Sequence, residues 1–164
     1  MRSVLNYVLA ATLASTLACG GSSGPAGPSA NNNNNNTAGT MTAQVNGSGW
    51  TASVVKRAFL SGGTVLTVQG SDGQNRIITI VVRGTTAGNY SLALGNGLGH
   101  NALYTANLGT ANWSTALNGG AGTFTITSIT ATQVRGTFTF TGVSNIAGTA
   151  PVQVTSGQFD LPIT

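Results

Sequence analysis

Apolar and polar residues alternate most regularly in the last third of the chain. Between residues 122 and 127, Phe124 and Ile126 are separated by threonines, and the same spacing returns between residues 136 and 141. Successive side chains of a strand point to opposite faces of a sheet, so each segment predicts a strand with one apolar face and one threonine face. The residues between them, 131–133, predict the turn of a hairpin.

A change in this alternation occurs near the C-terminus. Val152 and Val154 occupy even positions, whereas Phe159 and Leu161 occupy odd positions. Because a strand keeps its apolar residues on one face, the flip across Ser156-Gly157 predicts a β-bulge or a bend at that point.

The strongest apolar run lies in the middle of the chain. Arg76–Arg83 is β-branched between its two terminal arginines, which predicts a central strand. Before it, Asn46-Gly47 is a hairpin-turn signal, which predicts one strand over residues 41–45 and its partner over residues 50–56.

Four further segments have the composition of strands, and no stretch of the domain shows a sustained helical period. The total is about nine or ten short strands separated by glycine-rich turns. This pattern predicts an all-β domain, either an antiparallel β-sandwich or a barrel-like sheet. The four segments are 64–69, 89–94, 102–107 and 112–117, of which the last two are expected to form a hairpin.

The beginning of the chain has the pattern of a secretion signal. Met1-Arg2 gives a positive start, and Val4 to Leu17 is almost wholly apolar or small. This run is too short for a stable membrane span and has the length of a secretory hydrophobic region. We therefore expect residues 1–18 to be a signal peptide.

Cys19, the one cysteine of the chain, follows this leader directly. The segment Thr16-Leu17-Ala18-Cys19-Gly20 resembles a bacterial lipobox in its relaxed form, because the leucine is one position closer to the cysteine than in the commonest form. The resemblance implies cleavage after Ala18 and attachment of lipid, including palmitate, at Cys19. The alternatives are an ordinary cleavage site and a free or buried cysteine. Gly20 is not the aspartate that retains similar lipoproteins in the inner membrane, so the resemblance favours a lipid-anchored protein of the outer membrane.

The segment that follows has the composition of a spacer. Residues 19–39 combine glycine, serine, proline and alanine with six consecutive asparagines, and they carry no charge. Such a segment buries too little apolar surface to offset its ordering entropy. We expect a flexible linker over residues 19–39 and one domain over residues 40–164, which is long enough for an adequate core.

Charge is sparse, since charged residues make up only 5% of the chain. The pI near 10.0 therefore rests on a few scattered basic residues, of which only Lys56-Arg57 form a pair. Proteins that bind nucleic acids concentrate basic residues on one face. We accordingly expect no nucleic-acid partner.

Groups for acid–base chemistry are also few. His100 is the only histidine, and Asp72 and Asp160 are the only acidic side chains. No Gly-x-Ser-x-Gly elbow leads into a helix, and one histidine without a cysteine in the domain cannot complete a structural zinc site. We therefore expect no enzymatic activity, no cofactor and no metal site, with Asp72 in a turn and His100 exposed in a loop.

The aromatic residues suggest where a ligand could bind. Trp50 and the phenylalanines are expected in the core, because large apolar rings are mostly buried. Trp113 and Tyr104 instead lie among polar residues near the glycine-rich loop that contains His100. We take Trp113, Tyr104 and His100 as the candidate ligand platform, with the two aromatic rings exposed for stacking on a sugar.

Two Thr-x-Thr-x-Thr rows, at residues 123–127 and 137–141, predict a regular hydroxyl surface if their strands pair. Ice-binding proteins use such rows. Threonine is also a common outward-facing residue of ordinary strands, which is the simpler explanation.

Four segments of the domain form a recognisable set: Asn46-Gly47 with Trp50-Thr51-Ala52, and residues 122–127, 136–140 and 154–159. On these segments, the domain resembles a family of small bacterial lipoproteins, common in Bacteroidota and related phyla, that is classed only as a domain of unknown function. The resemblance implies no catalytic or binding residues. We expect a lipid-anchored protein of the cell envelope that acts as a non-catalytic binding or interaction module for a glycan, a peptide or a partner protein. The alternative is a purely structural envelope lipoprotein, and a hydrolase or an ice-binding protein ranks lower.

Overall fold

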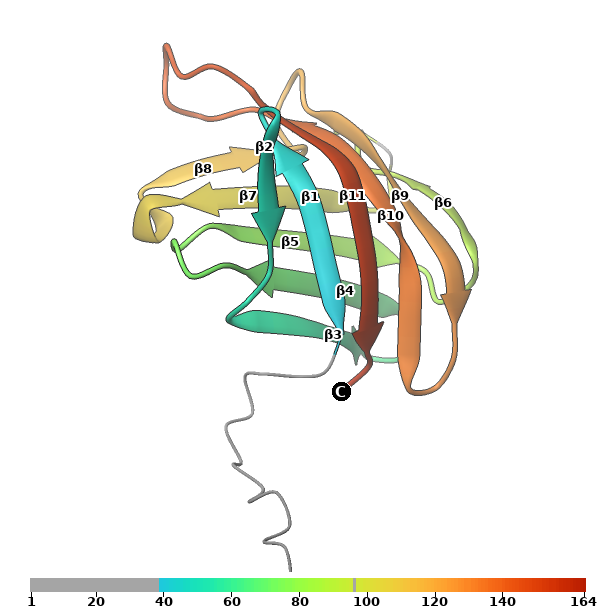
Figure 1. Cartoon of the computed structure of the whole chain (residues 1–164). Coiled ribbons are helices and arrows are strands. Elements are labelled where there is room, and N and C mark those ends of the chain that lie inside the picture. The colour runs from blue at the N-terminus through green and yellow to red at the C-terminus, as the bar shows by residue number, and fades with distance from the viewer. Residues whose placement is uncertain (1–38, 96) are drawn as a thin grey trace, which may run out of the picture. The chain divides into compact units, whose positions relative to one another are not determined.

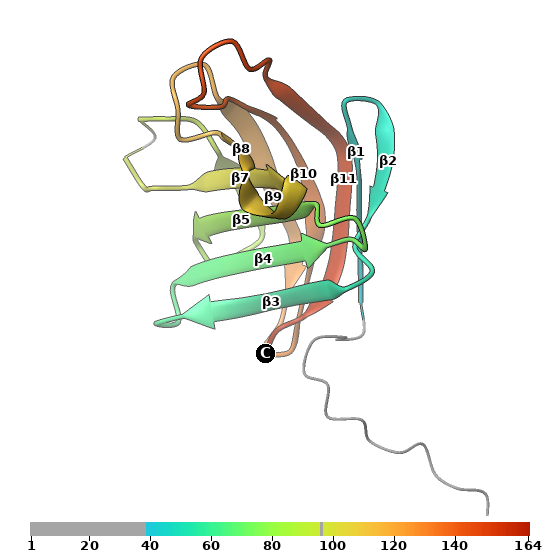
Figure 2. The same ribbon diagram turned by 90° about the vertical axis from the view of Figure 1, so that its left-hand side faces the viewer.

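The structure is a computed structural model that describes residues 39–95 and 97–164. Within these residues, two antiparallel sheets stack face to face and do not close into a barrel (Figure 1, Figure 2). The predicted β-sandwich is confirmed, with eleven strands in place of nine or ten. The elements are β1 (Thr40–Val45), β2 (Ser48–Thr51), β3 (Val55–Ser61), β4 (Val65–Ser71), β5 (Ile77–Arg83), β6 (Gly88–Ser91), β7 (Asn101–Ala106), the 3-10 helix η1 (Asn107–Gly109), β8 (Ala111–Ser114), β9 (Ala121–Ile129), β10 (Gln133–Gly142) and β11 (Val152–Pro162).

The two sheets differ in size and in strand order. The six-stranded sheet has the order β2-β1-β11-β10-β9-β6, and the five-stranded sheet has the order β3-β4-β5-β7-β8. Figure 1 shows the six-stranded sheet in front, with the strands of the other sheet crossing behind it. β5 lies in the middle of the five-stranded sheet, so the apolar run Arg76–Arg83 is central as predicted. No helix among the described residues has the length and the hydropathy that a membrane span requires.

A single apolar core fills the space between the sheets. Strands alternate buried and exposed residues, so β10 buries Phe138 and Phe140 and turns the intervening threonines outward. Phe124 of β9 stacks on Phe159 of β11, with 4.9 Å between the ring centroids. Trp50 is only 1% exposed, so its predicted core position is confirmed. The remaining largest buried side chains are Met41, Leu66, Ile78, Ile80, Leu92, Ile126, Leu161, Val68 and Val82.

A β-bulge interrupts β11 where the apolar alternation flips. Phe138 of β10 pairs with Gly157, whereas Phe140 pairs with Val154, so β11 contains one extra residue between these pairs. Ser156 adopts a left-handed backbone with φ of 51° at this point. The extra residue lets the apolar side chains on both sides of the bulge face the core, and the predicted bulge is confirmed.

The strand predicted over residues 50–56 is wrong, because the chain changes sheets within it. β2 ends at Thr51, and β3 begins at Val55 in the other sheet. The amides of Ser53 and Val54 both donate to the carbonyl oxygen of Ser71 in β4, at 2.9 and 3.0 Å. These two bonds hold the connection against the five-stranded sheet and end the pairing with β1.

Backbone bridges join the two sheets at both ends of the sandwich. Ser114 of β8 exchanges two backbone hydrogen bonds with Val143, which follows β10, at 2.8 and 3.0 Å. At the other end, the amide of Thr164 donates to the carbonyl oxygen of Ala58 in β3 at 2.9 Å. The first described residues and the C-terminus lie at this second end, and the β1–β2 turn and the β10–β11 loop lie at the first (Figure 1).

Candidate functional site

His100 is buried, at 5% exposure, and the expectation of an exposed loop histidine is wrong. Its Nδ1 lies 3.2 Å from the carbonyl oxygen of Ser91, and its Nε2 lies 3.3 Å from the carbonyl oxygen of Arg83. The ring also meets Tyr90 edge-on, with centroids 5.6 Å apart. Both nitrogens therefore face backbone carbonyls, and the ring ties the start of β7 to the ends of β5 and β6.

The structure brings Tyr104 and Trp113 together, as the predicted platform requires. They are register partners in β7 and β8, and their ring centroids are 5.5 Å apart. Tyr104 is only 5% exposed, however, so the expectation that both rings are exposed is wrong. Trp113 is half-buried, and its indole N–H donates to the carbonyl oxygen of Ala150 at 2.9 Å.

The reason for this burial is the direction in which β7 turns its side chains. Tyr104 shares the core-facing side of β7 with the small residues Ala102 and Ala106, and these leave room for the ring. Burial raises the pKa of the Tyr104 hydroxyl above its ordinary value of 10.0, while the nearby Arg76 opposes the shift and Asp72 adds to it. Tyr104 therefore belongs to the core at the β4–β5 turn.

Asp72 organises that turn. Its Oδ1 accepts the amide protons of Gln74 and Arg76 at 2.8 and 3.0 Å, and its Oδ2 pairs with Nε of Arg76 at 2.6 Å. The carboxylate is 7% exposed, so the ion pair replaces the water that burial removes. The predicted turn role of Asp72 is confirmed, and its oxygens face these partners instead of His100.

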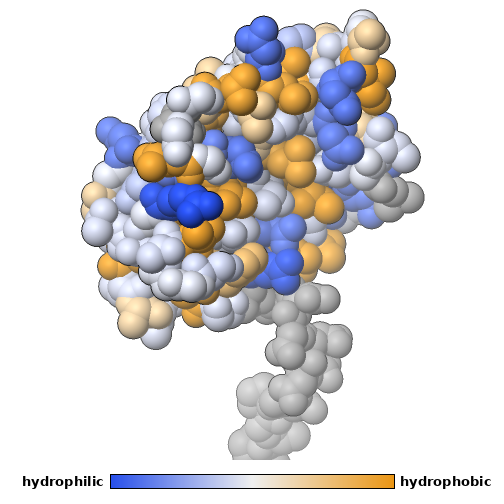
Figure 3. Space-filling view, turned by 180° about the vertical axis from the view of Figure 1, so that it is seen from behind, coloured by the Kyte–Doolittle hydropathy of each residue, from blue (hydrophilic) through white to orange (hydrophobic). Residues whose placement is uncertain are grey.

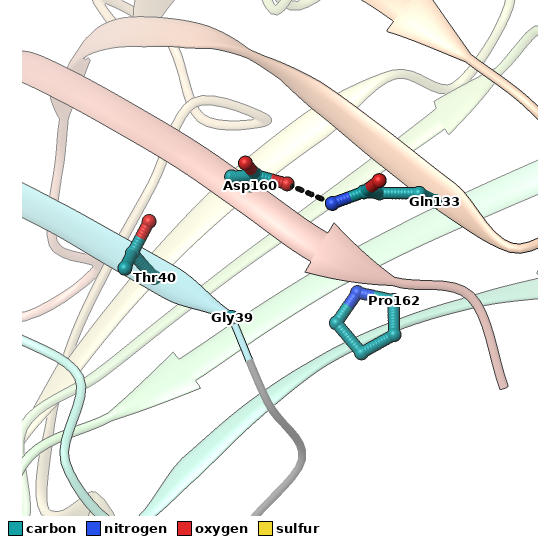
Figure 4. A pocket seen from close by; sticks show the side chains of 5 residues that line it. All are labelled: Gly39, Thr40, Gln133, Asp160 and Pro162. Carbon is teal, nitrogen blue, oxygen red and sulfur yellow. Dashed lines mark hydrogen bonds between the residues drawn. The ribbon is translucent and has the colours of Figure 1, made fainter.

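Asp160 lies on the outer surface of the six-stranded sheet, beside a pocket of about 180 Å³ (Figure 4). Gln133 donates to its Oδ1 at 2.5 Å, and Nε of Arg135 lies 3.0 Å from its Oδ2. The carboxylate is 39% exposed, which agrees with its predicted outward direction. The three groups considered for acid–base chemistry, His100, Asp72 and Asp160, are thus each held by a different set of partners. The pocket is lined by Gly39, Thr40, Gln133, Asp160 and Pro162.

The outer surface of the six-stranded sheet carries an uninterrupted row of uncharged polar side chains. The predicted threonine rows pair in part: Thr137 lies opposite Thr125 and Thr139 lies opposite Thr123, but Thr127 falls in a register shift. The row through Thr137 continues across all six strands. We call this surface the neutral face, and it comprises Thr51, Thr42, Gln158, Thr137, Thr125 and Asn89 in one row, with Gln44, Thr155, Thr139 and Thr123 in the next.

The outer surface of the five-stranded sheet has a different character. The guanidinium of Arg57 lies over the ring of Phe59, 5.6 Å from its centroid, and its Nε donates to Gln69 at 2.8 Å. Phe59 is half-buried on this outer surface, so the expectation that it belongs to the core is wrong. Seen from behind, apolar side chains lie between strongly hydrophilic ones (Figure 3).

Among the described residues, four large apolar side chains are exposed: three of them lie in two loops, and the fourth, Val54, lies in the β2–β3 connection. Leu94 and Leu98 are 59% and 53% exposed in the glycine-rich β6–β7 loop, and Ile146 is 53% exposed in the β10–β11 loop. A hollow of about 130 Å³ lies beside His100 and is lined mainly by glycines and alanines of the first loop and by Ala116. No group of three or more metal-ligating His, Cys, Asp or Glu side chains occurs in residues 39–95 and 97–164.

The neutral face and the pocket at its edge were not predictable from the sequence. The threonine rows pointed to two strands of this face, but they could not show that β1, β2, β6 and β11 extend it. The pocket joins residues from the two ends of the domain, Thr40 and Asp160, which meet because β1 pairs with β11. Cys19 and the leader lie outside the described residues, so the lipid anchor stays a prediction.

The chain matches a known sequence family. The sequence model of the family described as "Domain of unknown function (DUF6252)" matches residues 36–160, which include ten of the strands in full and most of β11. No curated protein and no solved structure matches the chain. The predicted resemblance to a family of unknown function is thereby confirmed. The chain belongs to the DUF6252 family, and the matched residues cover nearly all of the β-sandwich described above.

Proposed function

We propose that this protein is a lipid-anchored binding module of the cell envelope, without catalytic activity of its own. The anchor would be Cys19, which follows an apolar leader and precedes an uncharged spacer. Lipid on an N-terminal cysteine, followed by about 20 residues of flexible-linker composition, would hold a domain at a root-mean-square distance of about 25 Å from a membrane surface. The outer membrane is the location that the residue after the cysteine favours.

The observation that carries the proposal is the position of the first strand. β1 begins at Thr40, directly after the spacer, and it pairs with the end of β11 at one end of the sandwich. The start of β1 lies at the same end of the sandwich as the C-terminus, and the β1–β2 turn and the β10–β11 loop lie at the opposite end (Figure 2). This arrangement suits a domain that presents a surface to a partner.

The acid–base groups support a non-catalytic role. The nitrogens of His100 face two backbone carbonyls, and Asp72 is engaged by Arg76 and by turn amides. A catalytic base must be free to reach the proton that it abstracts. The partner classes that we propose are therefore those that a binding surface serves: a glycan, a peptide or another protein.

Two measurements test the anchor and the binding separately. Metabolic labelling with a palmitate analogue should mark the full chain and leave a Cys19→Ser variant unmarked; absence of label on the unaltered chain would contradict the anchor. A thermal-shift screen of the full chain in detergent against glycans, peptidoglycan fragments and peptides tests binding. A ligand at about 100 times its Kd adds about 2.7 kcal/mol, which raises the midpoint by several degrees. A flat screen would favour a purely structural envelope lipoprotein.

A further inference from the structure

The charged side chains are distributed very unequally between the two sheets. Residues 39–164 contain seven charged side chains, and five of them lie on the five-stranded sheet or in its β4–β5 turn. The six-stranded sheet carries only Arg135 and Asp160, which pair with each other at 3.0 Å near one edge of the surface. Its outer surface therefore presents no unbalanced charge. The five on the other sheet are Lys56, Arg57, Asp72, Arg76 and Arg83.

The register makes the neutral face a continuous surface. Thr42 pairs with Thr51 on one side and with Gln158 on the other, and Thr137 pairs with Gln158 and Thr125. Asn89 of β6 completes the row opposite Thr125, and its amide oxygen accepts the hydroxyl proton of Thr125 at 2.8 Å. Neighbouring strands lie about 4.8 Å apart, so six strands give a row about 24 Å long.

The chemistry of these side chains limits what can cover them. Threonine hydroxyls and glutamine and asparagine amides each donate and accept hydrogen bonds. An apolar partner would leave these groups buried without partners, which costs about 1–3 kcal/mol for each group. A charged polymer would find no unbalanced opposite charge on this surface, because Arg135 and Asp160 pair with each other. A sugar is uncharged, and its hydroxyl groups both donate and accept hydrogen bonds, so it can pair with these side chains. The threonine methyl groups can contact the C–H groups of the sugar ring.

The shape of the face favours a flexible chain over a rigid lattice. The register shifts between Thr42 and Gln44, between Arg135 and Gly136, and between Phe138 and Phe140. Such bulges increase the local twist of a sheet, and twisted strands do not offer the regular flat array that an ice surface needs. A polymer with rotatable glycosidic bonds can follow the twist.

The pocket at the edge of the face supplies a place where such a chain could be held more firmly. Thr40 and Asp160 are neighbours of the rows on β1 and β11, and Gln133 reaches Asp160 from β10 (Figure 4). A carboxylate oxygen accepts strongly from a hydroxyl group, and the amide and the threonine hydroxyl can donate to the neighbouring sugar oxygens. The charge of Asp160 is balanced by Arg135, so the pocket stays suited to an uncharged ligand.

We infer that the neutral face, with its edge pocket, binds an uncharged polysaccharide lying across the strands of the six-stranded sheet. This inference rests on the proposed binding role and specifies both the surface and the ligand class. It places the ligand away from Trp113 and Tyr104, which lie between the sheets.

The test is electrophoresis of the full chain, in a mild detergent, through native gels that contain dextran, laminarin or mannan, with polygalacturonate as the charged comparison. Two variants place opposite charges in the central row: Thr137→Lys and the nearly isosteric Gln158→Glu, both at exposed positions. Ser61→Lys, at an exposed position of the five-stranded sheet, is the matched control. Unfolding midpoints of all variants verify that they fold.

We expect at least one neutral polysaccharide to retard the unaltered chain, and each charge in the row to raise Kd at least tenfold, while Ser61→Lys leaves it unchanged. Retardation by polygalacturonate alone, loss of binding with only one sign of charge, or binding unaffected by both row variants would overturn the inference. Absence of retardation by all three neutral polymers would also overturn it. If the thermal-shift screen then identifies a peptide or protein ligand, the proposed binding function is retained, and only the assignment of a polysaccharide to the neutral face is rejected.

Discussion

Trp113 donates its indole N–H to the carbonyl oxygen of Ala150 at 2.9 Å and thereby links β8 of the five-stranded sheet to the loop before β11 of the six-stranded sheet. The same side chain covers Gly142 of β10, where an added Cβ would lie 2.8 Å from Cβ of Trp113. Together with the Ser114–Val143 bridge, this contact closes one end of the sandwich. Trp113 therefore has a structural role whether or not it also contacts a ligand.

Replacement of Trp113 by phenylalanine should test that role. The substitution keeps an aromatic ring against Tyr104 but removes the hydrogen bond to Ala150, which contributes about 1 kcal/mol to the free energy of unfolding. For a domain of this size, we expect the unfolding midpoint to fall by about 4 °C. An unchanged midpoint in a calorimetric scan would show that the bond does not help to join the sheets.

Gly136 should tolerate no side chain. A Cβ at this position would collide with the carbonyl oxygen of Thr125 and would lie 2.6 Å from the Phe159 ring. Because a backbone atom cannot move aside cheaply, Gly136→Ala should lower the free energy of unfolding by about 3 kcal/mol. Gly49→Ala is the control, since nothing lies within 4 Å of a Cβ there, and its effect should stay within about 0.5 kcal/mol. Urea unfolding compares the two variants.

His100→Phe should destabilise the domain although it preserves the aromatic contact with Tyr90. The new ring leaves the carbonyl oxygens of Ser91 and Arg83 facing carbon, which should cost about 2 kcal/mol. Tyr90→Phe is the control. Its hydroxyl donates to the carbonyl oxygen of Thr86 near the surface, so its loss should cost less than about 1 kcal/mol. Equal midpoints for both variants would contradict the structural role of His100.

The stability of the domain should fall at high pH in part because of Tyr104. Burial raises the pKa of its hydroxyl in the folded state above the ordinary value of 10.0. The hydroxyl therefore ionises first in the unfolded chain, and stability that is fully present below pH 10 is lost as the pH rises through the folded-state pKa. Urea unfolding at pH 8 and pH 11 should show a smaller loss for Tyr104→Phe than for the unaltered chain. An equal loss of stability in the two proteins would mean that the Tyr104 hydroxyl has the same pKa in the folded and the unfolded chain.

The local pattern was sufficient to predict most of the strands and the bulge in β11. The flip between Val154 and Phe159 predicted the extra residue at Ser156, because side-chain direction depends only on neighbouring positions. The change of sheet after Thr51 was not predictable in this way. It depends on Ser71, whose carbonyl oxygen accepts hydrogen bonds from two amides of the β2–β3 connection. These bonds join residues that are not neighbours in the sequence, so the local pattern does not reveal them.

The candidate site could be predicted only in fragments. The pairing of Thr137 with Thr125 follows from a hairpin of adjacent strands, but the pairing of Thr42 with Gln158 joins residues that are far apart in sequence. For Tyr104, the alternation of side chains along β7 defines two faces of the strand but does not show which face packs against the core. The alanines on either side of it leave space for the ring, and this was the one signal in the sequence that pointed to burial.

The segregation of charge gives the domain an electrostatic orientation. The five-stranded sheet and its turn hold four cationic side chains and one anionic side chain, whereas the charges of the six-stranded sheet cancel. Anionic lipid headgroups attract basic side chains over roughly one Debye length. If the proposed anchor at Cys19 tethers the domain to such a surface, this attraction would turn the five-stranded sheet toward the lipid and the neutral face toward the surrounding medium.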